Sequence, residues 1–191
     1  MTISPRMVLL FSGHMIDAPE RKTPRFPPSE EPTAAREIGR VLRELSAGPQ
    51  DIAICGGACG GDLLFAEAAL VLGCRLEIYL PFEEERFVET SVAFANHDWL
   101  QRFERALKSA ALLEVAHRPL DIGDDPFEAN NRRMLEAARR FGDHAVEFVC
   151  LWNGQTGDAP GGAEHMMQEV RQAGGGVHWL DTRRLWGPKL S

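Results

Sequence analysis

Short apolar runs alternate with amphipathic stretches along the whole chain. Apolar runs bounded by glycine, proline or polar turns are typical of buried parallel strands, and they predict strands at 7–11, 51–55, 74–80, 112–115, 145–152 and 177–180. Between these runs, apolar positions recur at helical spacing and fall on one face. We therefore predict helices at 34–45, 63–72, 83–110 (in two pieces), 127–141 and from Gly162 to Gln172.

A chain in which strands and helices alternate builds a parallel sheet with helices on both faces. The expected fold class is therefore α/β, with a doubly wound, mostly parallel sheet flanked by helices in a Rossmann-like, three-layer arrangement. The 191 residues contain no internal repeat, linker or low-complexity tract, so we expect a single domain over 1–191. A proline-rich loop at 13–33 interrupts the pattern, and so long a loop is typically a lid, a binding loop or disordered.

Composition narrows the classes of partner. The net charge is −7 and the sequence pI is about 5.4, which argues against nucleic acid because that partner requires a dense basic surface. The four cysteines, at 55, 59, 74 and 150, lack zinc-ligand spacing. They indicate small buried or turn residues in a reducing compartment, and we expect no metal and no cofactor.

No run of the sequence approaches the ~20 apolar residues of a membrane span. The first apolar run, 7–11, is also too short for a signal peptide and is followed by a polar loop. We therefore expect no membrane partner and a cytoplasmic location.

Three predicted strands end in unusual runs of small residues: Ser12–His14, Gly56–Asp62 and Asn153–Gly162. In an open parallel sheet, ligands lie beyond the carboxyl ends of the strands. Glycine lets the backbone approach an anion closely, and the following helix directs free N–H groups and its positive dipole end toward that anion. A Gly-Gly pair after a strand is also often only a tight turn. Because several such turns occur in one chain, we predict that they bind a phosphate-bearing small molecule.

The predicted ligand-binding residues come from these turns and from the proline-rich loop. They are Ser12, Gly13, His14, Arg25, Gly56, Gly57, Ala58, Gly60, Gly61, Asp62, Asn153, Gln155, Pro160, Gly161, Gly162 and Glu164.

Several of these residues have structural alternatives. Asp62 is expected either to contact a ribose hydroxyl or to cap a helix. His14 contacts the ligand or serves the turn, and Arg25 grips a phosphate or is a solvated loop cation. Asn153 and Gln155 contact a base edge or form their turn. The Gly-x-Gly-x-x-Gly dinucleotide fingerprint after the first strand and the Gly-Lys-Ser/Thr phosphate loop are both absent from the sequence.

Two segments carry a resemblance to a known family. The run Cys55–Asp62, followed by an Ala-rich stretch, resembles the Gly-x-Ala-x-Gly-x-Asp turn of DprA/Smf proteins. The run Pro160–Gln168 resembles the Pro-Gly-Gly-x-Gly-Thr-x-x-Glu turn of LONELY GUY-type phosphoribohydrolases. Together they place the chain near the SLOG superfamily, which unites both groups.

This resemblance implies a doubly wound sheet, a homodimer and a site for a nucleotide or nucleotide-derived ligand. The ribohydrolases use the last glutamate of the motif at the ribosyl carbon, but here that position is Gln168. Glu164 and Glu169 lie nearby and are the candidate catalytic residues of an alternative function, N-glycosidic hydrolysis of a nucleoside monophosphate or NAD-derived compound. The favoured hypothesis is binding or sensing of the nucleotide, and a structural or partner-binding module is a third.

Overall fold

The computed structural model of the protein describes residues 4–116, 125–155 and 162–187. Its centre is a six-stranded sheet with the order β4-β3-β2-β1-β5-β6, and the five pairs of neighbouring strands are all parallel. The strands are β1 (Val8–Gly13), β2 (Ile52–Cys55), β3 (Arg75–Leu80), β4 (Leu112–Val115), β5 (Val146–Trp152) and β6 (Gly176–Asp181).

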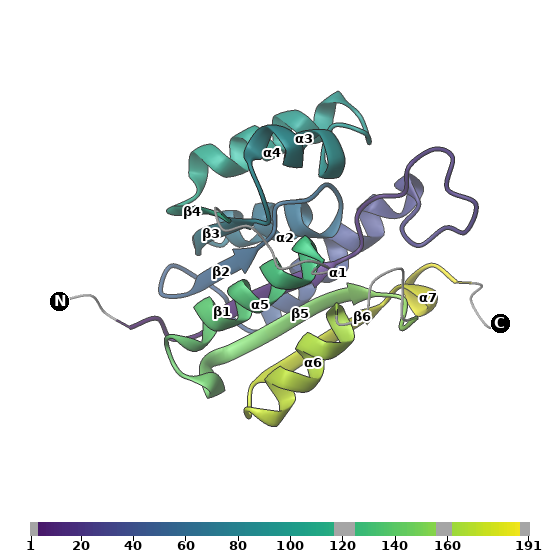
Figure 1. The fold of residues 1–191 in the computed structure, drawn as a ribbon. Coiled ribbons are helices and arrows are strands. Elements are labelled where there is room, and N and C mark those ends of the chain that lie inside the picture. Colours follow the sequence, from purple (N-terminus) through teal and green to yellow (C-terminus); the bar gives the residue numbers. More distant parts are fainter. Residues whose placement is uncertain (1–3, 117–124, 156–161, 188–191) are drawn as a thin grey trace.

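Seven α-helices flank the sheet in the described part of the chain, which confirms the predicted α/β, three-layer arrangement. They are α1 (Glu31–Glu44), α2 (Gly61–Val71), α3 (Glu84–Ser91), α4 (His97–Ser109), α5 (Pro126–Arg139), α6 (Ala163–Gln172) and α7 (Thr182–Leu185). Two 3-10 turns, at Pro28–Glu30 and Asp143–Ala145, precede α1 and β5. Helices α1 to α4 pack on one face of the sheet, and α5 and α6 pack on the other (Figure 1).

The continuous apolar runs are explained by burial on both faces of the sheet. Successive side chains of a strand point to opposite faces, so Leu9 and Phe11 of β1 join the core under α1 and α2, whereas Val8 and Leu10 join the core under α5 and α6. All four side chains are fully buried. A central strand with helices on both sides therefore needs no polar positions.

The proline-rich loop is shorter and better packed than its composition predicts. Pro32 lies in the first turn of α1, where a missing N–H costs nothing, so this helix begins three residues before the predicted Ala34. Within the loop, the Asp17 carboxylate accepts hydrogen bonds from the N–H groups of Arg25 (2.8 Å) and Phe26 (2.9 Å). The fully buried Phe26 ring stacks on Trp186 at 5.3 Å. The loop is thus anchored at its centre.

The strand order places a topological switch point between β1 and β5. From β1 the chain builds outward through β2, β3 and β4, and it then returns to the other side of β1 to add β5 and β6. Helices on opposite faces diverge at such a point and leave a crevice at the carboxyl ends of the strands. In the described residues, none of the helices is both long and apolar enough to cross a membrane.

Candidate functional site

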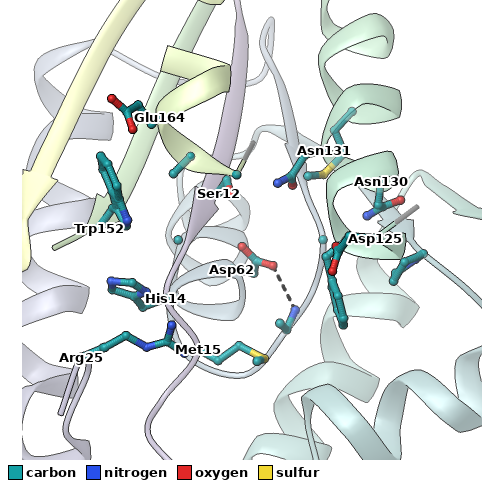
Figure 2. A pocket seen from close by; sticks show the side chains of 18 of the residues that line it. Ser12, His14, Met15, Arg25, Asp62, Asp125, Asn130, Asn131, Trp152 and Glu164 are labelled. Carbon is teal, nitrogen blue, oxygen red and sulfur yellow. Dashed lines mark hydrogen bonds between the residues drawn. The ribbon is translucent and has the colours of Figure 1, made fainter. Parts of the chain in front are cut away.

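A cavity of about 410 Å³ opens at this switch point. Its walls come from the ends of β1, β2 and β5, the loop after β1, the turn after β3, and the first turns of α5 and α6 (Figure 2). The residues that line it are Ser12, Gly13, His14, Met15, Arg25, Gly56, Ala58, Asp62, Pro81, Phe87, Asp125, Phe127, Asn130, Asn131, Met134, Trp152, Gly162, Ala163 and Glu164. Gly56 and Ala58, after β2, therefore line the same cavity as Gly162 at the start of α6.

His14, at the end of β1, is held in one orientation by the neighbouring strand end. The backbone N–H of Asn153 donates to Nε2 of His14 (3.1 Å), and the N–H of His14 donates to the carbonyl of Leu151 (2.9 Å). Because Nε2 accepts a hydrogen bond, the neutral ring carries its proton on Nδ1. Burial, reinforced by the nearby Arg25 guanidinium, lowers the pKa of His14 to about 4. At neutral pH the imidazole is therefore an uncharged donor.

Most glycines of the turn after β2 serve packing. Gly60 has φ +97°, and a Cβ there would lie 2.5 Å from the backbone nitrogen of Ile16. The segments pair directly, because Met15 forms an antiparallel bridge with Gly60. A Cβ on Gly61 would lie 2.9 Å from the Phe11 ring. Only glycine allows the loop after β1 to cross so close to the start of α2.

The N–H groups of this turn already have acceptors within the protein. Ala58 donates to the Asp62 carboxylate (3.2 Å), Cys59 to the carbonyl of Ser91 (2.9 Å), and Gly61 to the carbonyl of His14 (3.1 Å). The dipole of α2 still points at the cavity. These three N–H groups, however, bind the protein itself, so the turn supplies shape to the site more than it supplies anion donors.

Asp62 is not the N-cap of α2, because that position is Gly60 and carries no side-chain capping hydrogen bond. Its carboxylate accepts the N–H of Ala58 in the preceding turn, and it lines the cavity (Figure 2). Burial raises the pKa of Asp62 to about 7, although hydrogen bonds from the N–H groups of Ala58 and Gly56 partly oppose that rise. Near neutral pH this group is divided between a carboxylate acceptor and a carboxylic acid donor.

The β5–α6 junction supplies an aromatic wall and a helix N-terminus. Trp152 ends β5 and lines the cavity, and its indole N–H donates to the carbonyl of Gln155 (3.0 Å). Gly162 is the N-cap of α6 and, being glycine, makes no side-chain capping hydrogen bond. Glu164, an exposed residue in the first turn, also lines the cavity. This end of the site therefore combines N-terminal helix N–H groups with an aromatic face and a carboxylate.

Helix α5 forms the opposite wall. Its N-cap, Asp125, accepts the N–H of Glu128 (2.9 Å). Asn130 is buried, and its amide donates to the carbonyl of Tyr79 at the end of β3 (2.6 Å). Asn131 is directed toward the cavity (Figure 2). Asn130 and Asn131 both line the cavity from this helix.

The predicted site residues divide into three groups. Those that line the cavity are Ser12, Gly13, His14, Arg25, Gly56, Ala58, Asp62, Gly162 and Glu164. Those that lie outside its lining are Gly57, Gly60, Gly61, Asn153, Gln155 and Glu169. Pro160 and Gly161 fall outside the described residues.

Two of the residues outside the lining build the turn after β5. The side-chain oxygen of Asn153 accepts the N–H of Gln155 (3.1 Å), so this pair forms the turn that also orients His14. Glu169 lies on another face of α6 and binds Arg139 of α5 through its carboxylate (3.0 Å) and its carbonyl (3.0 Å). Glu169 therefore joins α6 to α5. It follows the motif position Gln168 by one residue, and one step along a helix rotates a side chain by about 100°.

Sequence reasoning missed Asp125 and Phe127, which begin the α5 wall, and the apolar side chain of Phe87 from α3. The Asp125-Pro126 pair is an N-cap followed by a proline in the first turn, which is a recognisable start signal. It could have placed a helix N-terminus at the same sheet edge. In the described residues, no group of three or more histidine, cysteine, aspartate or glutamate side chains is placed to hold a metal ion, and all four cysteines are free and buried.

No family model matches the chain, and no curated protein matches it significantly. Among solved structures it is similar to the Moco carrier protein from Chlamydomonas reinhardtii, with 12% sequence identity, a TM-score of 0.38, and coverage of 93% of this chain and 91% of that chain. At that level of similarity nothing about function transfers, and the cavity itself is the guide to the ligand.

Proposed function

We propose that the protein binds or senses a nucleotide or nucleotide-derived phosphate ligand in the cavity at the β1/β5 switch point. The observation that carries this proposal is the convergence, on one cavity, of the Arg25 guanidinium, the N-terminus of α6, whose N-cap is a glycine, and the Trp152 ring. These groups suit a phosphate and a base. The volume of about 410 Å³ also lies in the range of small-molecule sites.

We place the phosphate between Arg25 and the first turn of α6. The turn after β2 is less suited to it, because the Ala58, Cys59 and Gly61 N–H groups donate to the protein. Arg25 is presented by a loop that Asp17 and Phe26 anchor, and a guanidinium binds phosphate through two parallel hydrogen bonds. The Nδ1–H of His14 adds an uncharged donor next to it.

A SLOG-type relationship is part of this proposal. Its support is that both quoted motifs, Cys55–Asp62 and the Gly162 end of the second, contribute to the same cavity. The single domain, the homodimer and the cytoplasmic location remain predictions of the sequence. Light scattering on the purified protein tests the dimer.

Isothermal titration calorimetry with AMP, nicotinamide mononucleotide, ADP-ribose and cyclic nucleotides tests the function. We expect saturable binding of at least one of them, and we expect Arg25→Ala to weaken it at least tenfold, since it removes a charge-assisted contact worth about 1.5–3 kcal/mol. Lys22→Ala removes an exposed cation of the same loop that is outside the cavity lining, and it should leave the affinity unchanged. If none of these ligands binds, the proposal is contradicted. It is also contradicted if Arg25→Ala and Lys22→Ala lose affinity to the same extent.

N-glycosidic hydrolysis is the second candidate function, and the location of Glu164 in the cavity favours it. A carboxylate there would stabilise an oxocarbenium-like ribosyl carbon or orient water. Glu169 contributes nothing to this chemistry, because it binds Arg139. Release of free base from AMP or nicotinamide mononucleotide, abolished by Glu164→Ala, would support hydrolysis. Intact nucleotide after prolonged incubation would leave binding as the function.

A further inference from the structure

We propose that this cavity selects a nucleoside monophosphate with a cationic heterocyclic base, which stacks on Trp152 within reach of Glu164. The inference rests on the proposed function and specifies its ligand class. It combines two independent features of the described lining: its balance of charges and a tryptophan ring that is fixed before any ligand binds.

The charge balance of the cavity limits the number of phosphates. Among the lining residues that the structure describes, the ionisable groups are one cation, Arg25, and three carboxyl groups, Asp62, Asp125 and Glu164, while His14 is neutral. Even when Asp62 is protonated, carboxylates outnumber cations two to one. Each phosphate of a nucleotide adds between one and two negative charges, so a di- or triphosphate would face uncompensated repulsion. One phosphate, paired with Arg25 and the N-terminus of α6, fits this balance.

Trp152 is held in position by its neighbours. Its indole N–H binds the Gln155 carbonyl (3.0 Å), and its own carbonyl accepts the indole N–H of Trp179 (3.0 Å). The Trp152 and Trp179 rings lie 5.9 Å apart at an interplanar angle of 38°. Because Trp152 lines the cavity while these contacts fix it, a stacking ligand finds a preorganised surface and loses little entropy in ordering it.

A positively charged ring suits this wall better than a neutral one. The face of tryptophan is the side-chain surface that attracts cations most strongly. Glu164 starts the helix that follows the Trp152 strand, and both side chains line the cavity (Figure 2). A pyridinium or another N-alkylated ring on Trp152 would therefore gain from the aromatic face and from the carboxylate together. A neutral adenine would gain from stacking alone.

The decisive comparison uses two probes of nearly the same shape. Nicotinamide mononucleotide carries a cationic ring, and its 1,4-dihydro form carries a neutral one. Calorimetry should show binding of the cationic form about tenfold tighter, which is what a partly desolvated cation–π contact provides. In the same assay ADP and ATP should bind more weakly than AMP.

Two variants assign the preference to residues. Trp152→Leu and Glu164→Gln should each reduce the ratio of affinities for the cationic and neutral forms, and Glu164→Gln should leave affinity for the neutral form unchanged. Glu104→Gln removes an exposed charge of α4 outside the cavity and should preserve the ratio. Equal affinity for both forms, or tighter binding of ATP than of AMP, overturns the inference while AMP binding upholds the proposed function. If no nucleotide binds, both fail.

Discussion

Replacing Asp62 with asparagine should change how the stability of the protein depends on pH. Burial raises the pKa of Asp62 from 3.8 to about 7 in the folded state. Between these pH values the folded protein holds a proton that the unfolded chain releases, so the contribution of this group falls as pH rises from 3.8 to 7. The asparagine side chain keeps the shape and the acceptor for Ala58, and it removes the titration.

His14 acts in the opposite direction. Its pKa falls from 6.5 to about 4 on folding, so the unfolded chain holds a proton that the folded protein lacks, and stability is lost as pH falls from 6.5 to 4. Each unit of pH within either window is worth about 1.4 kcal/mol. In the wild type, the effects of Asp62 and His14 on the free energy of unfolding largely cancel between pH 4 and 6.5. Between pH 6.5 and 7 only the decrease in stability caused by Asp62 remains.

The free energy of unfolding of Asp62→Asn, relative to wild type, should therefore increase by about 2 kcal/mol between pH 5 and 7, because Asp62 is already half ionised at pH 7. Urea titrations followed by tryptophan fluorescence at pH 5, 6, 7 and 8 measure this difference. Glu104→Gln removes an exposed carboxylate from α4 and serves as the control, and its difference from wild type should not change with pH. A flat difference for Asp62→Asn as well would refute the burial of this carboxyl group as described.

Two further predictions concern stability. Gly60→Ala should destabilise the protein by about 3 kcal/mol, because its Cβ would overlap the backbone of Ile16 at 2.5 Å. Gly174→Ala is also at positive φ but has nothing within 4 Å, so it should cost only about 1 kcal/mol. Equal costs in urea titrations would argue against the close crossing of the loop after β1 and the start of α2. Arg102→Leu should lower stability by about 2 kcal/mol, because the guanidinium lies 2.6 Å from both Glu31 and Glu67 and its side chain is 9% exposed. Arg102→Lys should recover part of this stability. An unchanged melting temperature for the leucine variant would show that these ion pairs do not stabilise the fold.

The central strands β1 and β2 could be predicted because they are buried on both faces and appear as short apolar runs. The edge strands β4 and β6 are partly exposed, but each still contains an apolar run. All six lie where the apolar runs indicated, and β1 extends to Gly13 because it pairs with Leu151 of β5. The start of α1 was misplaced for a local reason: Pro32 was treated as loop punctuation, although the first helical turn accepts proline. Helix α7 has four residues and is too short to show any periodicity.

The site was predictable where it depends on strand ends and unpredictable where it depends on how helices pack. Ser12, Gly56 and Gly162 meet because the carboxyl ends of parallel strands share one edge of the sheet. The Asp125 wall arises because α5 crosses from β4 to β5 on the opposite face, which the sequence does not encode locally. Glu169 was misassigned to the site because its proximity to Glu164 in the sequence does not fix its face of the helix.

A glycine-rich turn after a parallel strand has two physical origins, and its N–H groups distinguish them. If the glycines expose the backbone to an anion, the N–H groups of the turn point to the ligand; if they let two segments cross, the N–H groups bind the crossing segment. The Gly61 N–H binds the carbonyl of His14 and the Ile16 N–H binds the carbonyl of Cys59 (3.2 Å), so this turn is of the second kind. This difference supports the proposal that the phosphate lies at the α6 end of the cavity, which is lined by the glycine N-cap Gly162 and by Arg25.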